Sequence, residues 1–262
     1  ERIGYKQKAL LIIGLSLVHF FMNARSLGGI TLLSGILILV PDIVRKQIDT
    51  RNLLGWKQLL LGSGLLYLFI TGYSFVAGSG FLGQEAKEKY EMQTRNGENI
   101  LSGGRGEYLA SIPAIMDSPI LGHGSWAKNP KYIKGLLVKK GEDFTNPKFY
   151  EMIESGRIPT HSHLLGGWVE AGLMGFVFWL IVLRICLKSV LLNTKFGMTK
   201  LYPFVAYCLL TFLWDLPFSP FGLERRLMNP YFIIIAIITI SYVVSMEKMS
   251  LEERTVNLNL NK

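Results

Sequence analysis

The sequence predicts an all-α polytopic membrane protein with about six transmembrane helices and one large structured loop outside the membrane. Half of its 262 residues are hydrophobic and only 18% are charged, whereas soluble domains average about 25% charged residues. Long apolar stretches alternate with short basic connectors, and the mean hydropathy is positive. Composition and patterning together therefore favour a bilayer over a large soluble core.

The expected spans are six apolar segments, at residues 9–22, 27–44, 59–77, 168–187, 201–216 and 230–246. A span needs about 20 residues, so the first segment is short. Aromatic residues near the ends of the later segments, such as Trp56, Trp168 and Tyr231, are typical of membrane interfaces. The segments divide the chain into three helices in 1–77, a loop at 78–160, three helices in 161–246 and a tail at 247–262.

The charge distribution predicts the orientation. Lys and Arg are concentrated in the connectors near residues 1–8, 45–57, 188–200 and 248–262, whereas the opposite short connectors carry only Arg25, Arg225 and Arg226. Cytoplasmic loops carry the excess of Lys and Arg. We therefore expect a multi-pass protein of the inner (cytoplasmic) membrane, with the large loop on the periplasmic or extracellular side and the tail in the cytoplasm.

Two other readings of the composition are disfavoured. The net charge of +9 does not indicate nucleic-acid binding, because the basic residues flank helices and form no continuous stripe. Cys186 and Cys208 lie inside apolar segments, where a disulfide framework of an outer loop would not place them. We expect both cysteines to be packing residues.

The long loop is expected to be structured. Its helix signals are a charged stretch at Gln84–Arg95, an apolar stripe from Tyr108 to Met116 and a short helix at Pro147–Ser155. Pro113 is expected to kink the second of these, and Gly122-His123-Gly124 to form a turn after it. An apolar stripe on a short helix outside the membrane predicts contact with the bilayer or with a cavity.

Polar residues that could carry chemistry are expected on the outer side: Arg25, Arg105, His161, His163 and Glu170. Taken singly, Arg25 is more often a snorkelling flank and Arg105 a solvated loop residue. His161 and His163 precede a helix, where Thr160 or Ser162 commonly caps. Glu170 differs, because an unpaired carboxylate about two turns into an apolar helix is costly. We expect Glu170 to pair with an arginine or a histidine.

A metal site is disfavoured. His161 and His163 are spaced as ligands on a strand would be, but at the start of a helix their rings diverge. His123 could add a third ligand, yet no cysteine or paired acidic motif supports it. A Gly-rich phosphate loop, a Ser/His/Asp arrangement and paired catalytic carboxylates are all missing from the sequence. We expect neither a metal nor a cofactor.

The run from His161 to Gly175 resembles the signature of the O-antigen ligase and O-antigen polymerase family. In that signature a histidine opens the run, a glutamate follows nine residues later, and glycines come two and five residues after the glutamate. His161, Glu170, Gly172 and Gly175 occupy these positions.

Two further segments resemble the same family, so that the likeness covers about residues 20–245. The segment from Arg105 to Gly124 looks like the family's loop helix, ending in a D-x-P-x-L-G-x-G turn at residues 117–124. The segment 23–28 looks like its arginine step at the outer start of a helix. The departures are Ser162 where Asn is common, Pro113 inside the loop helix, and the absence of the family's N-terminal helices. Because the chain opens with Glu1, we expect it to be the C-terminal portion of a longer protein.

The resemblance implies a metal-independent glycosyltransferase of lipopolysaccharide biosynthesis. It would move a glycan from a polyprenyl-diphosphate carrier, such as undecaprenyl diphosphate, to a sugar hydroxyl of a glycolipid acceptor. Arg25 and Arg105 would bind the diphosphate, His161 would be the base, and Glu170 would orient a neighbouring side chain. His163 and His123 are secondary candidates.

Three functions remain open at this point. A ligase uses the sugar of a lipid A core as acceptor, whereas a polymerase of O-antigen or exopolysaccharide repeat units uses another lipid-linked repeat. A non-enzymatic lipid-glycan transporter or assembly scaffold is the third alternative, and broken helices with charges near the bilayer midplane would favour it.

Overall fold

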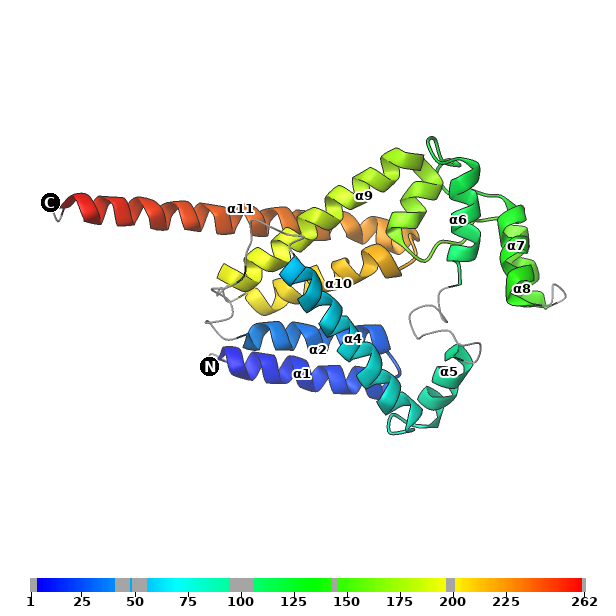
Figure 1. Cartoon of the computed structure of the whole chain (residues 1–262), viewed down its shortest axis with the longest axis horizontal. Helices are drawn as coiled ribbons and strands as arrows, with labels where there is room; N and C mark the ends of the chain where they lie inside the picture. Colours follow the sequence, from blue (N-terminus) through cyan, green and yellow to red (C-terminus); the bar gives the residue numbers. More distant parts are fainter. Residues whose placement is uncertain are drawn as a thin grey trace. The chain divides into compact units, whose positions relative to one another are not determined.

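The computed structural model describes residues 4–40, 48, 56–94, 106–142, 146–196 and 201–260. Within these ranges the chain is entirely helical, and its one extended pairing is an isolated antiparallel bridge between Lys128 and Arg157. The predicted all-α class is confirmed (Figure 1). The helices are α1 (Tyr5–Phe21), α2 (Arg25–Leu39), α4 (Trp56–Gly78), α5 (Gln84–Thr94), α6 (Tyr108–Asp117), α7 (Pro130–Lys140), α8 (Pro147–Ser155), α9 (His163–Phe196), α10 (Tyr202–Phe218) and α11 (Leu223–Leu260).

Two helices in the described ranges are long and apolar enough to cross a membrane, His163–Phe196 and Leu223–Met246. Arg25–Leu39 and Tyr202–Phe218 are apolar but shorter. In the most apolar stretches of the two long helices, only 28% and 22% of the residues are buried, so most of these residues are at least partly exposed. The core helix of a soluble protein buries most of such a stretch. Two of the six predicted spans therefore correspond to described helices that are long and apolar enough to cross a membrane.

The chain forms two compact units. The first unit comprises Glu1–Leu61, Arg184–Phe212 and Met228–Lys262, and the second comprises Gly62–Leu183 and Leu213–Leu227.

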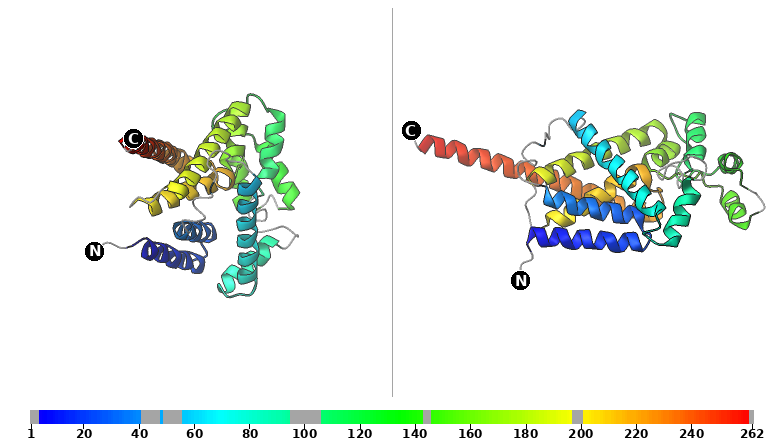
Figure 2. Two further views of the ribbon diagram at one scale, coloured as in Figure 1. Left: turned by 60° about the vertical axis from the view of Figure 1, so that its left-hand side comes forward. Right: turned by 60° about the horizontal axis from the view of Figure 1, so that its bottom comes forward.

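In the first unit, α1 and α2 form a close antiparallel hairpin, and both views in Figure 2 show them side by side. Gly28 and Gly35 permit the approach, because a Cβ at Gly35 would lie 2.5 Å from Cγ1 of Ile13. The Tyr202 hydroxyl donates to the Leu37 carbonyl oxygen at 3.0 Å and joins α10 to α2. The small core here includes Ala9, Ile38 and Tyr202.

Cys186 and Cys208 are buried free thiols of the first unit. The Cys186 Sγ lies 3.4 Å from the Leu209 carbonyl oxygen. The prediction that both cysteines are packing residues is confirmed.

The second unit contains the helices of the long loop. The expected helices Gln84–Arg95 and Pro147–Ser155 are present as α5 and α8, but α7 was not predicted. Asn129 caps α7 by accepting from the Lys131 backbone N–H at 3.0 Å. Gly141 ends it in the left-handed region at φ 67°. Both are standard boundary residues for a helix.

α6 packs through its small residues. Ala110, Ala114 and Ile115 belong to the core of the second unit, which also includes Tyr132 of α7 and Val169 of α9. Two residues of the predicted apolar stripe, Ile112 and Met116, are instead exposed. The smaller Ala110 and Ala114 face this core in their place. Pro113 lies inside α6, which runs unbroken from Tyr108 to Asp117, so the expected kink does not interrupt the helix.

Candidate functional site

The candidate site is built around a break in α9. Ala171 (φ −118°, ψ 15°) and Gly172 (φ 59°, ψ −149°) leave the helical region and divide α9 into a short arm at 163–170 and a long arm at 173–196. Figure 1 shows the ribbon turning sharply there. The conformation at Gly172 is almost restricted to glycine, since a Cβ would meet the preceding backbone.

The two arms of α9 touch where glycines leave room. A Cβ built on Gly175 would lie 2.1 Å from the Gly167 carbonyl oxygen, and one built on Gly167 would lie 2.3 Å from the Trp179 ring. No side chain fits at either position without moving the backbone or a buried indole. The sharp fold of α9 therefore requires both glycines.

The turn after α6 packs against this break and satisfies its backbone groups. The N–H groups of His123 and Gly124 donate to the carbonyl oxygens of Val169 (2.7 Å) and Glu170 (2.9 Å). In return, the Leu173 N–H donates to the Ile120 carbonyl oxygen at 3.2 Å. The polar groups freed by breaking a helix are costly when buried without partners. The turn 117–124 and the run 161–175 thus form one interlocked structure.

Glu170 ends the short arm and has two partners. Its Oε1 accepts from the Trp126 backbone N–H at 3.1 Å and from Nη2 of Arg226 at 2.5 Å. The two charged side chains are 17% and 20% exposed, so this ion pair is largely shielded from solvent. The carboxylate thus has the arginine partner that its place in an apolar run requires.

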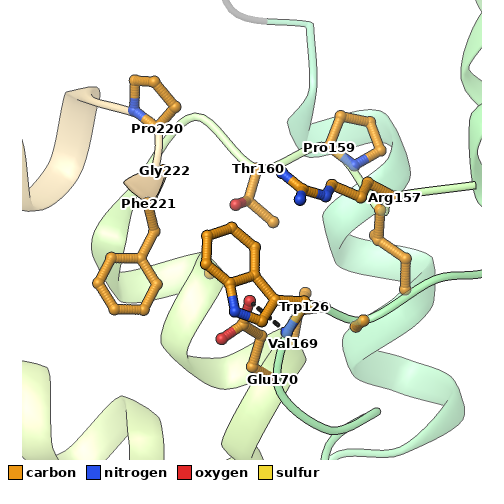
Figure 3. A pocket seen from close by; sticks show the side chains of 12 residues that line it. Trp126, Arg157, Pro159, Thr160, Val169, Glu170, Pro220, Phe221 and Gly222 are labelled. Carbon is orange, nitrogen blue, oxygen red and sulfur yellow. Dashed lines mark hydrogen bonds between the residues drawn. The ribbon is translucent and has the colours of Figure 1, made fainter. Parts of the chain in front are cut away.

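Trp126 carries two arginine side chains on its indole. The guanidinium carbon of Arg226 lies 4.1 Å from the ring centroid, and that of Arg157 lies 4.5 Å away. Arg226 also lies 4.0 Å from the Phe221 ring centroid. Arginine over an aromatic face is a favourable contact, and it fixes the plane of the guanidinium group. Figure 3 shows the indole in the middle of the site, with the Glu170 carboxylate close by.

Backbone pairing holds Arg157 in place. The Ile158 N–H donates to the Ala127 carbonyl oxygen at 3.0 Å, and the Asn129 N–H donates to the Gly156 carbonyl oxygen at 2.7 Å. These bonds flank the bridge between Lys128 and Arg157. They fix the backbone of Arg157, and its exposed side chain lies beside Trp126.

These residues enclose an open hollow of about 170 Å³. A hollow of this size can hold several water molecules or one small chemical group. Its walls are partly aromatic and partly charged (Figure 3). The lining residues are Trp126, Ala127, Arg157, Ile158, Pro159, Thr160, Gly166, Val169, Glu170, Pro220, Phe221 and Gly222.

His161 follows Thr160 of the hollow's wall and faces a carboxylate. Its Nδ1 lies 3.5 Å from Oε1 of Glu107, and the side chains are 35% and 26% exposed. Burial alone would raise the pKa of Glu107, but the His161 ring, the Glu107 backbone N–H and the charge of Lys140 together hold it below 4.5. Glu107 therefore stays ionised near neutral pH and contacts Nδ1 of the His161 ring. The second ring nitrogen, Nε2, is not part of this contact.

The secondary histidines have structural surroundings. His163 is fully buried, stacked on Trp179 with 5.3 Å between ring centroids and edge-on to Phe221 at 5.3 Å. The Nε2 of His123 lies 2.7 Å from the Ala114 carbonyl oxygen, to which it can only donate. Ser162 caps α9, as expected, by accepting from the Leu165 N–H at 3.3 Å. Among the described residues, no cluster of three or more His, Cys, Asp or Glu could hold a metal ion.

The structure does not test the two arginines expected at the diphosphate. Arg105 lies outside the described residues. Arg25 is the first residue of α2 and belongs to the first unit. The charged residues that the structure does bring together are His161, Glu170, Glu107, Arg157 and Arg226.

Sequence reasoning missed a second buried acid. Asp215, 2% exposed, pairs with Arg225 and accepts from the Ser219 hydroxyl at 2.6 Å. It lies in the apolar run of α10, so the argument that singled out Glu170 would also have found it. Glu107, Trp126 and Arg157 lie on loops or at helix ends, where no periodic pattern marks them.

Comparison of the chain with protein-family models, with curated protein sequences and with solved structures gave no match.

Proposed function

We propose that this chain is a glycosyltransferase of the O-antigen ligase type, embedded in the inner membrane with its loop on the outer side. The observation that carries the proposal is the interlocking of two distant segments. The turn 117–124 and the run 161–175, on which the family resemblance rests, are hydrogen-bonded to each other, and the same run begins with the partly exposed His161. Separate chance likenesses would have no reason to meet in one site.

The membrane placement is supported by the outward-facing apolar side chains of two long helices. It is supported also by the concentration of Lys and Arg on one set of connectors. The remaining apolar helices would complete the six spans. The hollow and His161 would then lie at the outer membrane surface, where the sugar part of a lipid-linked substrate is found.

The proposed reaction is a single displacement at the anomeric carbon of the donor glycan. An acceptor hydroxyl, in the ligase case on a lipid A core, forms the new C–O bond while the bond to the carrier diphosphate breaks, which inverts the anomeric centre. His161 takes the hydroxyl proton through Nε2. The Glu107 carboxylate, 3.5 Å from Nδ1, stabilises the imidazolium that results.

The departing diphosphate takes the electrons of the broken bond and needs positive charge nearby. Arg25 and Arg105 remain our candidates for that role, since guanidinium groups donate in pairs to phosphate oxygens. Glu170 acts indirectly in this proposal: its ion pair with Arg226 holds the wall of the hollow in place.

The test is a transfer assay with purified protein, a polyprenyl-diphosphate glycan donor and a lipid A core acceptor. We expect turnover without a divalent metal, a loss of ~10²–10⁴-fold in His161→Ala, and a large loss in Arg105→Ala. Lys134→Ala is the control, because this exposed side chain of α7 has no part in the proposed reaction. If His161→Ala and Arg105→Ala transfer glycan as well as the wild type, the assignment fails.

A repeat-unit polymerase is the alternative within the same chemistry. The glycolipids of a deletion strain distinguish the two. A lipid A core capped by one repeat indicates that a polymerase was lost, whereas free lipid-linked polymer beside a bare core indicates the loss of a ligase.

A transporter or scaffold is the non-enzymatic alternative, and the broken α9 is the observation that favours it. However, the carbonyl oxygens of Val169 and Glu170 at the break accept hydrogen bonds from the turn 117–124. In transporters such carbonyls coordinate the ion. The break in α9 is therefore better explained as the place where that turn packs and forms hydrogen bonds.

A further inference from the structure

Arg157, a cation at the wall of the hollow, has no assigned role in the proposed glycosyl transfer. Glu170 neutralises Arg226 within the site. Arg157 has no carboxylate partner in the described part of the chain, and its charge lies at the wall of the hollow. An uncompensated cation beside an open hollow is a place where an anion gains most from binding.

The backbone and the side chain of Arg157 are both restrained by contacts. Its backbone is paired with the 127–129 segment, and its guanidinium carbon lies 4.5 Å from the centroid of the Trp126 ring. A guanidinium over an aromatic ring can still donate its N–H groups, and their forked geometry matches two oxygens of one carboxylate or phosphate. The contact with Trp126 reduces the side-chain entropy that binding must still remove.

The remaining walls restrict what can enter. Trp126, Phe221, Pro159 and Val169 line part of the hollow with apolar surface, and its volume of about 170 Å³ suits a small group. The Glu170 carboxylate, engaged by Arg226 and by the Trp126 N–H, has its charge balanced and does not repel an incoming anion strongly.

We infer that this hollow is an oxyanion-binding subsite in which Arg157 holds one carboxylate or phosphate group of the substrate. Two parts of the proposed substrate carry such a group: the carrier diphosphate, or an acidic sugar within the glycan. The identity of the molecule that carries this anionic group rests on the proposed function, whereas the binding of an anion at Arg157 does not.

The test is calorimetric titration of the purified full chain, in detergent at fixed ionic strength, with inorganic pyrophosphate, glucuronate and glucose. We expect one or both anions to bind and glucose not to bind. Binding of pyrophosphate alone identifies the carrier diphosphate as the source, and binding of glucuronate alone identifies an acidic sugar. Arg157→Ala should weaken binding about 10- to 100-fold, the range for a charge-assisted hydrogen bond.

Matched variants separate a specific site from general positive charge. Lys134→Ala removes one exposed cation from α7 and should leave affinity within twofold of the wild type. Arg157→Lys keeps the charge but loses the fork, and should weaken binding less than Arg157→Ala. If neither anion binds, if Arg157→Ala binds as tightly as the wild type, or if glucose binds equally well, the subsite is overturned.

Failure of this inference can be told apart from failure of the proposed function. If anions bind at Arg157 but the wild type transfers no glycan, only the glycosyltransferase proposal fails. If the wild type transfers glycan and Arg157→Ala leaves anion binding unchanged, only the subsite fails.

Discussion

Gly172 shows how one residue can determine the shape of the site. At φ 59° and ψ −149° its backbone is in a region that side chains essentially exclude. A Cβ would lie 2.0 Å from the Ile120 carbonyl oxygen, inside the turn that closes the break. We therefore expect Gly172→Ala to lower the stability of the protein by at least about 3 kcal/mol, the strain of such a conformation together with the overlap.

Thermal unfolding in detergent measures this loss, and Gly135→Ala is the matched control. Gly135 lies in α7 with open space around it, so alanine there should be neutral or stabilise by up to ~1 kcal/mol through its better helix propensity. Equal melting temperatures for the two variants would contradict the account of the break.

The ion pair of Glu170 and Arg226 is expected to stabilise the site as a unit. Because both side chains are about four-fifths buried, removing either one leaves a partly desolvated charge. Each single alanine substitution should cost ~1–3 kcal/mol, and the double substitution should cost clearly less than their sum. Thermal unfolding of the wild type, both single variants and the double variant gives this coupling.

A second ion pair provides the comparison for that cycle. Lys131 and Asp117 lie 2.8 Å apart but are 70% and 45% exposed, and solvent screens such pairs. Their coupling should be close to zero. A coupling at Glu170–Arg226 no larger than that at Lys131–Asp117 would show that its burial contributes nothing.

The residues of the site were only partly predictable. Glu170 could be singled out because a carboxylate in an apolar run needs a partner. Arg226 could not be chosen as that partner, since it lies 56 residues away and only the tertiary fold brings the two together. Trp126 and Arg157 are single loop residues whose contact exists only after the 127–129 segment pairs with 156–158.

At the scale of helices, Tyr132 of α7 makes a polar contact with the last residue of α6, in addition to the Lys131–Asp117 ion pair. The Tyr132 hydroxyl donates to Oδ2 of Asp117 at 2.7 Å. Burial, together with this hydrogen bond to a carboxylate, raises the pKa of Tyr132 from 10 to about 12. The protonated phenol is thus favoured in the folded state, and its stabilising contribution is fully present below pH 10 and lost as the pH rises to about 12.

Tyr132→Phe tests this contact, because it removes the hydroxyl but keeps the ring. The variant should be less stable than the wild type by a constant amount below pH 10, and the difference should shrink between pH 10 and 12. Denaturant unfolding of both proteins at several pH values measures it. A difference that stays constant through pH 12 would mean that the hydroxyl does not titrate as the contact requires.

Helices were predictable where local signals are strong. The boundaries of α5 and α8 follow the charged and polar patterns at their ends, and each expected apolar segment overlaps a helix. α7 was missed because four lysines interrupt its apolar spacing, although Asn129 and Gly141 marked its ends. The break in α9 was not predicted, because no proline marks it and its hydrogen bonds to residues 120–124 form only in the tertiary fold.

For the whole molecule, the proposed function depends on which side of a membrane the second unit faces. Apolar side chains that face outward along two long helices suit a bilayer, and the distribution of Lys and Arg predicts that the long loop lies outside and the tail inside. Ser155, at the end of α8, and Lys248, in α11, are exposed positions on opposite sides of that predicted topology.

Single cysteines at these positions, treated with a membrane-impermeant thiol reagent, test the orientation. The native Cys186 and Cys208 are buried, so the wild type serves as the blank. In intact spheroplasts Ser155→Cys should be labelled and Lys248→Cys should not, whereas after permeabilisation both should react. The opposite pattern would place His161 and the Arg157 hollow in the cytosol, where they would face the wrong side of the membrane for a glycan already carried outside. Glycosyl transfer from an exported lipid-linked donor would then have to be abandoned, while the packing of Glu170, Arg226 and the turn 117–124 would stand unchanged, because it depends only on contacts within the second unit.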